Sequence, residues 1–87
     1  VEVRDVSGHS PGSVLFYIPA LEMAVVGDAI FQGSIGRTDF EESNHELLLK
    51  NIREQIYTLP DNTTLLPGHG PATTVAFEKA NNPYVRA

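Results

Sequence analysis

The chain has 87 residues and a formal net charge of −5, with six Lys or Arg side chains against eleven Asp or Glu. This length allows one small domain, and an acidic chain without a basic cluster excludes a nucleic-acid backbone as its expected partner. The absence of cysteine excludes disulfides and thiolate ligands, and no apolar run reaches the roughly 20 residues that cross a membrane, so we expect a cytoplasmic protein without a membrane partner.

The first part of the chain predicts three strands. Residues 1–6 begin by alternating apolar and polar side chains, which is typical of a strand with one face in water, and glycines and a proline in residues 7–12 end it. Residues 13–18 are rich in β-branched and aromatic side chains and predict a better-buried strand. A turn at residues 19–22 leads to a third predicted strand at residues 23–26.

Residues 27–43 form a long segment without periodicity. A loop of this length in a compact domain is usually either functional or disordered. Four large apolar side chains argue against disorder here: Ile30, Phe31, Ile35 and Phe40. We therefore expect this segment to be an ordered, functional loop.

A helix is predicted after this loop. Ser43 is placed as its N-cap, with Glu46 at the reciprocal position of a capping box. An apolar stripe at helical spacing follows: Leu48, Ile52, Ile56 and Leu59. Residues 60–62 end the helix and turn the chain.

The last part predicts a fourth strand at residues 63–66 and a short helix over residues 75–80, capped by Thr73 or Thr74. The expected fold class is therefore α/β, with a sheet of about four strands and two helices. Because two amphipathic helices cannot cover both faces of a sheet, one apolar face is expected to need a partner.

Three predicted strands end in the same way, with a glycine followed by a residue that can bind a metal: His9, Asp28 and His69. Glycine allows the sharp turns that such strand ends need, and open α/β sheets place their chemistry at one edge. Imidazole and carboxylate groups bind zinc or iron at about 2.0–2.2 Å. We hypothesise one metal site assembled by the fold. The alternative is that the histidines cap backbone carbonyls and Asp28 caps a loop amide.

These motifs resemble a known family. Residues 7–13 (SGHSPGS), 27–31 (GDAIF) and 67–71 (PGHGP) resemble the later motifs of the metallo-β-lactamase superfamily. Residues 33–40 (GSIGRTDF) narrow the resemblance to the branch similar to hydroxyacylglutathione hydrolase (glyoxalase II). The resemblance implies an αββα sandwich with two metals at one edge. The family's first motif, His-x-His-x-Asp-His, is absent, so residues 1–87 resemble the C-terminal half of such a domain.

By this resemblance His9 binds one metal ion, His69 binds the other, and Asp28 bridges them as the catalytic carboxylate. The ions are expected to be zinc, with iron or manganese as alternatives. They would polarise a thioester carbonyl and supply a bound hydroxide as nucleophile, hydrolysing S-lactoylglutathione to lactate and glutathione. Three of seven ligands are too few to hold a catalytic metal, so the fragment alone is expected to be inactive.

Arg37 has two interpretations. Its guanidinium can anchor a substrate carboxylate, or it can pair with Asp39 and stiffen the loop. The matching loop of glutathione thioesterases typically offers a lysine and a tyrosine, so the thiol carrier, glutathione or another, stays open.

Two other activities also remain open. One is a persulfide dioxygenase with a single iron, which would use His9 and Asp28 but not His69. The other is a non-catalytic half-domain that self-associates. The expected partners are a small thioester substrate and either the missing N-terminal half or a second copy of the chain.

Overall fold

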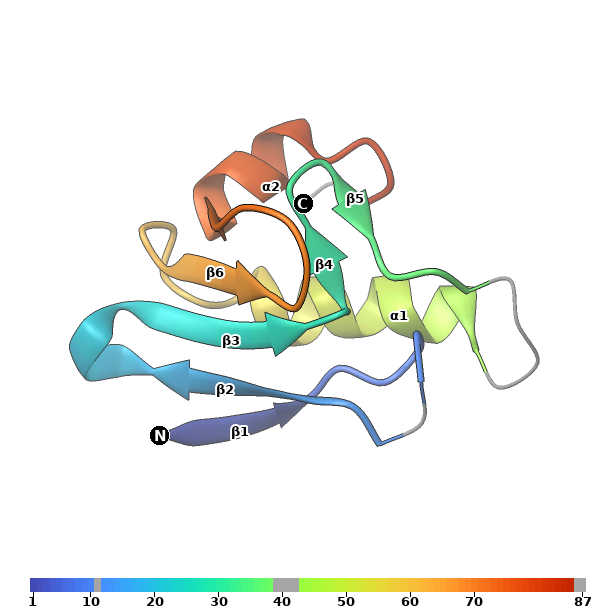
Figure 1. The fold of residues 1–87 in the computed structure, drawn as a ribbon, viewed down its shortest axis with the longest axis horizontal. Helices are drawn as coiled ribbons and strands as arrows, with labels where there is room; N and C mark the ends of the chain where they lie inside the picture. Colours follow the sequence, from blue (N-terminus) through green and yellow to red (C-terminus); the bar gives the residue numbers. More distant parts are fainter. Residues whose placement is uncertain (11, 39–42, 86–87) are drawn as a thin grey trace.

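The computed structural model of the chain describes residues 1–10, 12–38 and 43–85. Its elements follow in the order β1 (Glu2–Asp5), β2 (Val14–Ile18), the 3₁₀ turn η1 (Pro19–Leu21), β3 (Met23–Gly27), β4 (Ile30–Phe31), β5 (Ser34–Ile35), α1 (His45–Asn51), the π-helical segment η2 (Ile52–Ile56), β6 (Thr64–Pro67), β7 (Thr73–Thr74) and α2 (Val75–Asn81) (Figure 1). The predicted order of strands and helices is confirmed. Within the described residues no helix is long and apolar enough to cross a membrane.

One sheet contains five strands in the order β1-β2-β3-β6-β7. The pairs β1–β2, β2–β3 and β6–β7 are antiparallel, whereas β3 and β6 are parallel. The crossover between the two parallel strands carries α1 and η2, which Figure 1 shows behind the sheet. The α/β class is confirmed, and the fifth strand is the short edge strand β7. The expected long loop contains a separate ribbon, in which β4 pairs with β5.

The predicted stripe of the first helix is confirmed as its buried face. Leu48, Ile52 and Ile56 are fully buried and Leu59 nearly so. They join one cluster with strand residues that face the same side, among them Leu15, Ala24 and Leu65. Each large aliphatic side chain buried in this way contributes about 1.5–3 kcal/mol, so this helix–sheet contact contributes strongly to stability.

The first helix begins one residue later than predicted. Its N-cap is Asn44, not Ser43: the Asn44 side chain accepts a hydrogen bond from the Leu47 amide at 3.0 Å. Asparagine and serine cap helices about equally well, so the choice between the two positions depends on a tertiary contact. The backbone amide of Asn44 donates to the Gly8 carbonyl at 2.7 Å. The capping box is therefore not formed. For the second helix, Thr74 is the cap, with the Phe77 amide 3.1 Å from its hydroxyl.

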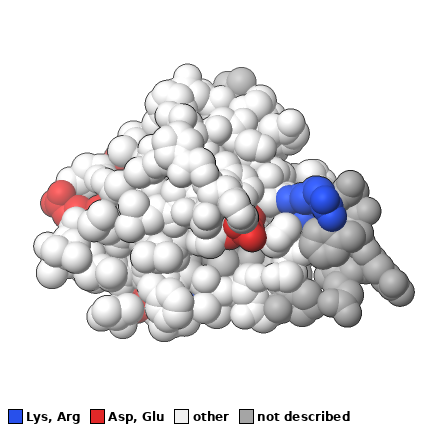
Figure 2. All heavy atoms as spheres, in the orientation of Figure 1, with Lys and Arg blue, Asp and Glu red and all other residues white. Residues whose placement is uncertain are grey.

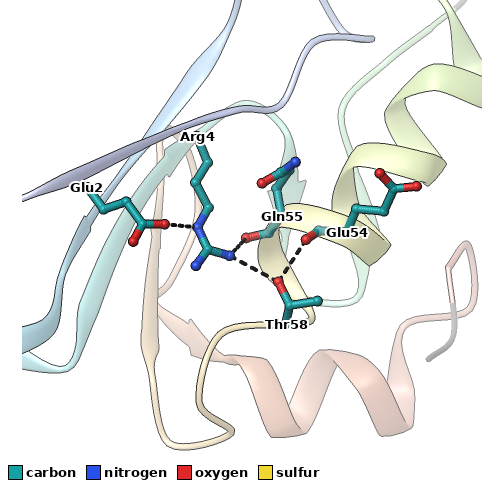
Figure 3. A network of polar contacts seen from close by, with 5 residues as sticks. All are labelled: Glu2, Arg4, Glu54, Gln55 and Thr58. Atoms are coloured by element: carbon teal, nitrogen blue, oxygen red, sulfur yellow. Dashed lines mark hydrogen bonds and ion pairs between the residues drawn. The ribbon is translucent and has the colours of Figure 1, made fainter.

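Strand β1 turns its polar side chains toward the helix. The Arg4 guanidinium donates to the Gln55 carbonyl at 3.1 Å and to the Thr58 hydroxyl at 3.0 Å, and it pairs with Glu2 (Figure 3). The Thr58 hydroxyl in turn donates to the Glu54 carbonyl at 2.7 Å. The polar side of β1 therefore faces the helix, and its apolar side faces away from it.

That apolar side belongs to a continuous row across four strands, in which Val3, Phe16, Val25 and Leu66 are register partners. Val3 is 56% exposed and Phe16 44%. We call this row, with the neighbouring exposed Val14, the open face. Figure 2 shows the molecule from the side opposite α1, and few charged side chains are visible on this side. On β2, the face with Val14 and Phe16 is open, whereas the face with Leu15 is covered.

Candidate metal centre

The three predicted ligands lie at one edge of the sheet. His9 follows β1, Asp28 follows β3 and His69 follows β6. Because β1 and β3 are each antiparallel to β2, they run in the same direction, and β3 is parallel to β6. The carboxyl ends of all three strands therefore meet on the same edge, which brings residues from distant parts of the chain together.

The Asp28 carboxylate lies between the two imidazoles. Its Oδ1 atom is 3.1 Å from Nδ1 of His69, and its Oδ2 atom is 3.7 Å from Nε2 of His9. Two ligands of one tetrahedral ion at about 2.1 Å lie about 3.4 Å apart, so both distances are close to those of ligand pairs. Each carboxylate oxygen faces a different histidine, which is the arrangement that a bridging carboxylate needs.

The His9 ring is oriented by the long loop. Its Nδ1 atom is 2.8 Å from the backbone carbonyl of Arg37, to which it can donate a hydrogen bond. This bond fixes the tautomer and leaves the Nε2 lone pair directed toward Asp28. Metal-binding histidines are commonly held in this way, with one nitrogen on a carbonyl and the other on the ion.

The loop that carries His9 is fastened to the first helix. The Asn51 side chain donates to the Ser7 carbonyl at 2.9 Å. Gly8 has a φ of +143°, and an added Cβ would lie 2.3 Å from Cβ of Leu48, so only glycine fits there. At the loop entrance the Ser7 hydroxyl and amide both donate to Asp5 and lower the pKa of that carboxyl.

Two glycines let the backbone close around Asp28. A Cβ at Gly68 would lie 2.6 Å from the Asp28 carboxylate, and a Cβ at Gly36 would lie 2.1 Å from the Asp28 carbonyl and 2.9 Å from Cβ of His9. The Gly68 amide also donates to the Gly27 carbonyl at 2.8 Å. The glycines of both motifs thus bring the ligand-bearing segments into direct contact.

The site is open on one side. The His69 side chain is 80% exposed. Within residues 1–10, 12–38 and 43–85, no three His, Asp or Glu side chains converge as a complete metal shell does. The donors instead form two pairs that share Asp28. Their chemistry fits part of a metal site, and further ligands would have to come from beyond these residues.

A cavity of about 420 Å³ is connected to the site through Arg37, which lines it and whose carbonyl lies 2.8 Å from Nδ1 of His9; none of the three donors is among its described lining residues. Its lining comes from the β4–β5 ribbon, the segment that follows it, the start of α1 and the C-terminal end: Phe31, Ser34, Ile35, Gly36, Arg37, Thr38, His45 and Tyr84. The Phe31 ring also contacts the His69 ring, with centroids 6.2 Å apart. We call this cavity the ribbon pocket.

Arg37 lines the ribbon pocket, as a substrate-binding residue would, and is itself exposed. The expected ion pair with Asp39 and the anchor Phe40 lie outside the described residues. His45 is exposed and also lines the pocket, with its Nδ1 atom 3.1 Å from the Thr38 hydroxyl. Sequence reasoning missed the pocket role of Tyr84, because nothing in its local pattern links it to the loop.

Comparison with protein families gives a match over residues 1–74 to the metallo-beta-lactamase superfamily. The chain belongs to this superfamily. The match covers all three segments that carry the predicted ligands.

Curated relatives of this member of the metallo-beta-lactamase superfamily are named for different activities. The chain is 49% identical over 78 residues to the probable metallo-hydrolase YqgX of Bacillus subtilis, covering 90% of the chain and 37% of the relative. It is 38% identical over 86 residues to the hydroxyacylglutathione hydrolase GloC of Haemophilus influenzae (99% and 41%). It is also 38% identical over 87 residues to the mitochondrial persulfide dioxygenase ETHE1 of Bos taurus (95% and 34%). The chain thus spans well under half of each relative.

Solved structures of the superfamily have the same fold over this chain. The B3 metallo-beta-lactamase BLEG-1 superposes with a TM-score of 0.95 at 43% identity, covering 99% of this chain and 41% of that one. TTHA1623 in a di-iron-bound form superposes with a TM-score of 0.92 at 38% identity, covering 97% and 42%.

Proposed function

We propose that this chain is the C-terminal half, residues 1–87, of a metal-dependent hydrolase that cleaves thioesters of the hydroxyacylglutathione type. The observation that carries this proposal is the Asp28 carboxylate, whose two oxygens face His9 and His69 separately at 3.7 and 3.1 Å. A carboxylate with one oxygen toward each of two histidines suits a two-metal site. The relative GloC, a hydroxyacylglutathione hydrolase by name, supports the substrate class.

The residues have distinct roles in this proposal. His9 holds one ion, His69 the other, and Asp28 bridges both. We propose zinc, with iron as the alternative that the di-iron form of TTHA1623 supports. When bound, such ions polarise a carbonyl and activate water. Arg37 has two roles. Its backbone carbonyl keeps the His9 ring in place, and its side chain, in the lining of the ribbon pocket, anchors a substrate carboxylate.

A second candidate function is persulfide oxidation at a single iron held by His9 and Asp28. The Bos taurus relative named as a persulfide dioxygenase supports this alternative. It leaves the 3.1 Å contact between Asp28 and His69 without a role in metal binding, and for that reason we place it second.

Metal content and a single variant separate the two functions. The full-length protein that contains this chain is expected to hold two metal ions per copy and to hydrolyse S-lactoylglutathione. His69→Ala is expected to leave one ion and to lower hydrolysis at least about 100-fold, since even groups that only support a ligand are worth 10–100-fold. Elemental analysis and a thioester assay measure both.

One iron per copy and oxygen consumption with glutathione persulfide, both unchanged in His69→Ala, would support the second function instead. His45→Ala is the matched control for metal content, because His45 is also an exposed histidine but lines the ribbon pocket instead of facing Asp28; it is expected to keep the wild-type number of ions.

We propose that the open face packs against the rest of the metallo-beta-lactamase domain. The observation that supports this proposal is the orientation of strand β1, which turns Arg4 toward the helix and leaves Val3 exposed to water. Soluble monomers rarely expose large apolar patches, and each Å² buried contributes about 25 cal/mol. In the 87-residue chain alone, a second copy would take this place.

Sedimentation of the 87-residue chain at micromolar concentration tests this proposal. We expect a dimer or larger species, and Phe16→Ser is expected to weaken self-association about tenfold or more, because Phe16 is central to the face and aromatic anchors dominate such contacts. Leu21→Ser is the control, since Leu21 is 62% exposed on η1, outside the face. A compact, cooperatively melting wild-type monomer would contradict the proposal.

A further inference from the structure

A buried carboxylate lies away from the metal-binding residues. Glu78, on α2, and Asn82, just after it, are both fully buried. Acidic side chains are almost never fully buried without partners, because desolvating them is costly. In the described part of the chain, hydrogen-bond donors rather than a cation compensate the buried Glu78 carboxylate.

The donors come from three separate segments. The Thr73 hydroxyl of β7 donates to one Glu78 oxygen at 2.6 Å. The backbone amide of Gly33, in the turn of the β4–β5 ribbon, and the Asn82 side chain donate to the other oxygen at 3.1 and 3.0 Å. One carboxylate thus connects the sheet edge, the ribbon and the C-terminal end.

Asn82 extends this network to both walls of the ribbon pocket. Its side-chain amide donates to the Ser34 carbonyl at 2.9 Å, and its side-chain oxygen accepts from the Tyr84 amide at 3.0 Å. Ser34 and Tyr84 both line the pocket. The same asparagine therefore holds the ribbon and the C-terminal segment at a fixed separation.

A tyrosine secures this network from inside the core. The Tyr57 hydroxyl lies 2.6 Å from the Val85 carbonyl and 3.1 Å from the Glu78 carbonyl, so it can donate to either. Burial, together with the charge of Glu78, raises the pKa of Tyr57 to about 12, and Arg53 opposes this rise. The hydroxyl therefore stays protonated and remains a donor.

We infer that Glu78 and Asn82 are positioning residues for substrate binding in the ribbon pocket, an inference that rests on the proposed hydrolase function. They fix the ribbon, which carries Phe31 against His69, and the C-terminal segment at Tyr84, which also lines the pocket. A carboxylate accepts all three hydrogen bonds with an anionic oxygen, whereas a glutamine must turn its NH₂ group toward the Thr73 hydroxyl, which then accepts, and offers Gly33 and Asn82 only a neutral oxygen. Neither residue touches the metal-binding side chains, so they act on pocket shape and leave the ligands in place.

Steady-state kinetics of Glu78→Gln in the full-length protein that contains this chain tests the inference. KM for the thioester is expected to rise about tenfold, the scale of one or two lost hydrogen bonds, with kcat within about twofold and metal content unchanged. Glu54→Gln, the same change at an exposed site, is expected to leave KM unchanged. Ile52→Val, a truncation in the core, controls for lost stability and is likewise expected to leave KM unchanged.

Hydrogen exchange provides a readout that does not depend on the reaction. In Glu78→Gln the Gly33 amide is expected to exchange at least about tenfold faster than in wild type, because its acceptor is weakened. Unchanged exchange at Gly33, or a rise in KM that Ile52→Val reproduces, would overturn the inference. A third outcome separates the two proposals. If the Gly33 amide exchanges faster in Glu78→Gln but the wild-type protein hydrolyses no thioester, the proposed function is overturned, whereas the role of Glu78 in holding the ribbon is supported.

Discussion

Asp28→Asn is expected to lower the metal-dependent activity of the full-length protein at least about 100-fold, since substitution of groups that merely support a ligand already costs 10–100-fold. In the described residues the Asp28 carboxylate faces both His9 and His69. An asparagine keeps the shape but replaces one anionic oxygen with an NH₂ group, which cannot bind a cation. Activity, metal content and circular dichroism of the variant measure the effect.

The control is the same change at Asp61. This aspartate is exposed and pairs with Lys79 at 3.0 Å on the surface, a type of ion pair that contributes about 0–1 kcal/mol. Asp61→Asn is expected to keep full activity and metal. Retention of two metals by Asp28→Asn would show that Asp28 does not bridge them.

Gly36→Ala is expected to lower activity by a similar factor, by a different route. Its Cβ would lie 2.1 Å from the Asp28 carbonyl and 2.9 Å from Cβ of His9, so both residues would have to move. The Gly36 amide donates to the Ala29 carbonyl at 3.0 Å, which keeps the loop from shifting away. Misplacement by about 1 Å can cost about 100-fold in rate, and overpacking costs about 1–3 kcal/mol of stability. Kinetics and thermal unfolding measure these two losses.

Gly70→Ala is the comparison. Gly70 has a φ of +79° with open space around its Cβ position, so alanine adds only backbone strain of about 1–2 kcal/mol. We expect Gly70→Ala to lose stability and keep most activity. Wild-type activity in Gly36→Ala would mean that this close approach does not set the geometry of the site.

The grouping of His9, Asp28 and His69 could be predicted because it depends on strand ends, which are visible in the sequence. A strand followed by glycine predicts where a chain turns, and strands of common direction bring those turns to one edge. Their side chains do lie together; their role as metal ligands remains a prediction.

Other features depend on contacts that local patterns do not contain. Asn44 is the N-cap of the first helix because its amide bonds to Gly8, and β4 and β5 have two residues each, too few for periodicity to be seen. The burial of Glu78 depends on a donor at Gly33, 45 residues earlier in the chain. Strand β1 alternates as predicted, but only Arg4 reaching the helix reveals which side is covered.

The separation between Asp28 and His69 has a consequence for the order of folding. The two residues are 41 positions apart in sequence, and they meet only after β3 and β6 have paired across the helical crossover. Such distant contacts form late, because the chain must first lose the entropy of closing a long loop. An ion held by both residues, as we propose, would therefore bind only after this pairing and would act as a cross-link that selectively stabilises the folded chain.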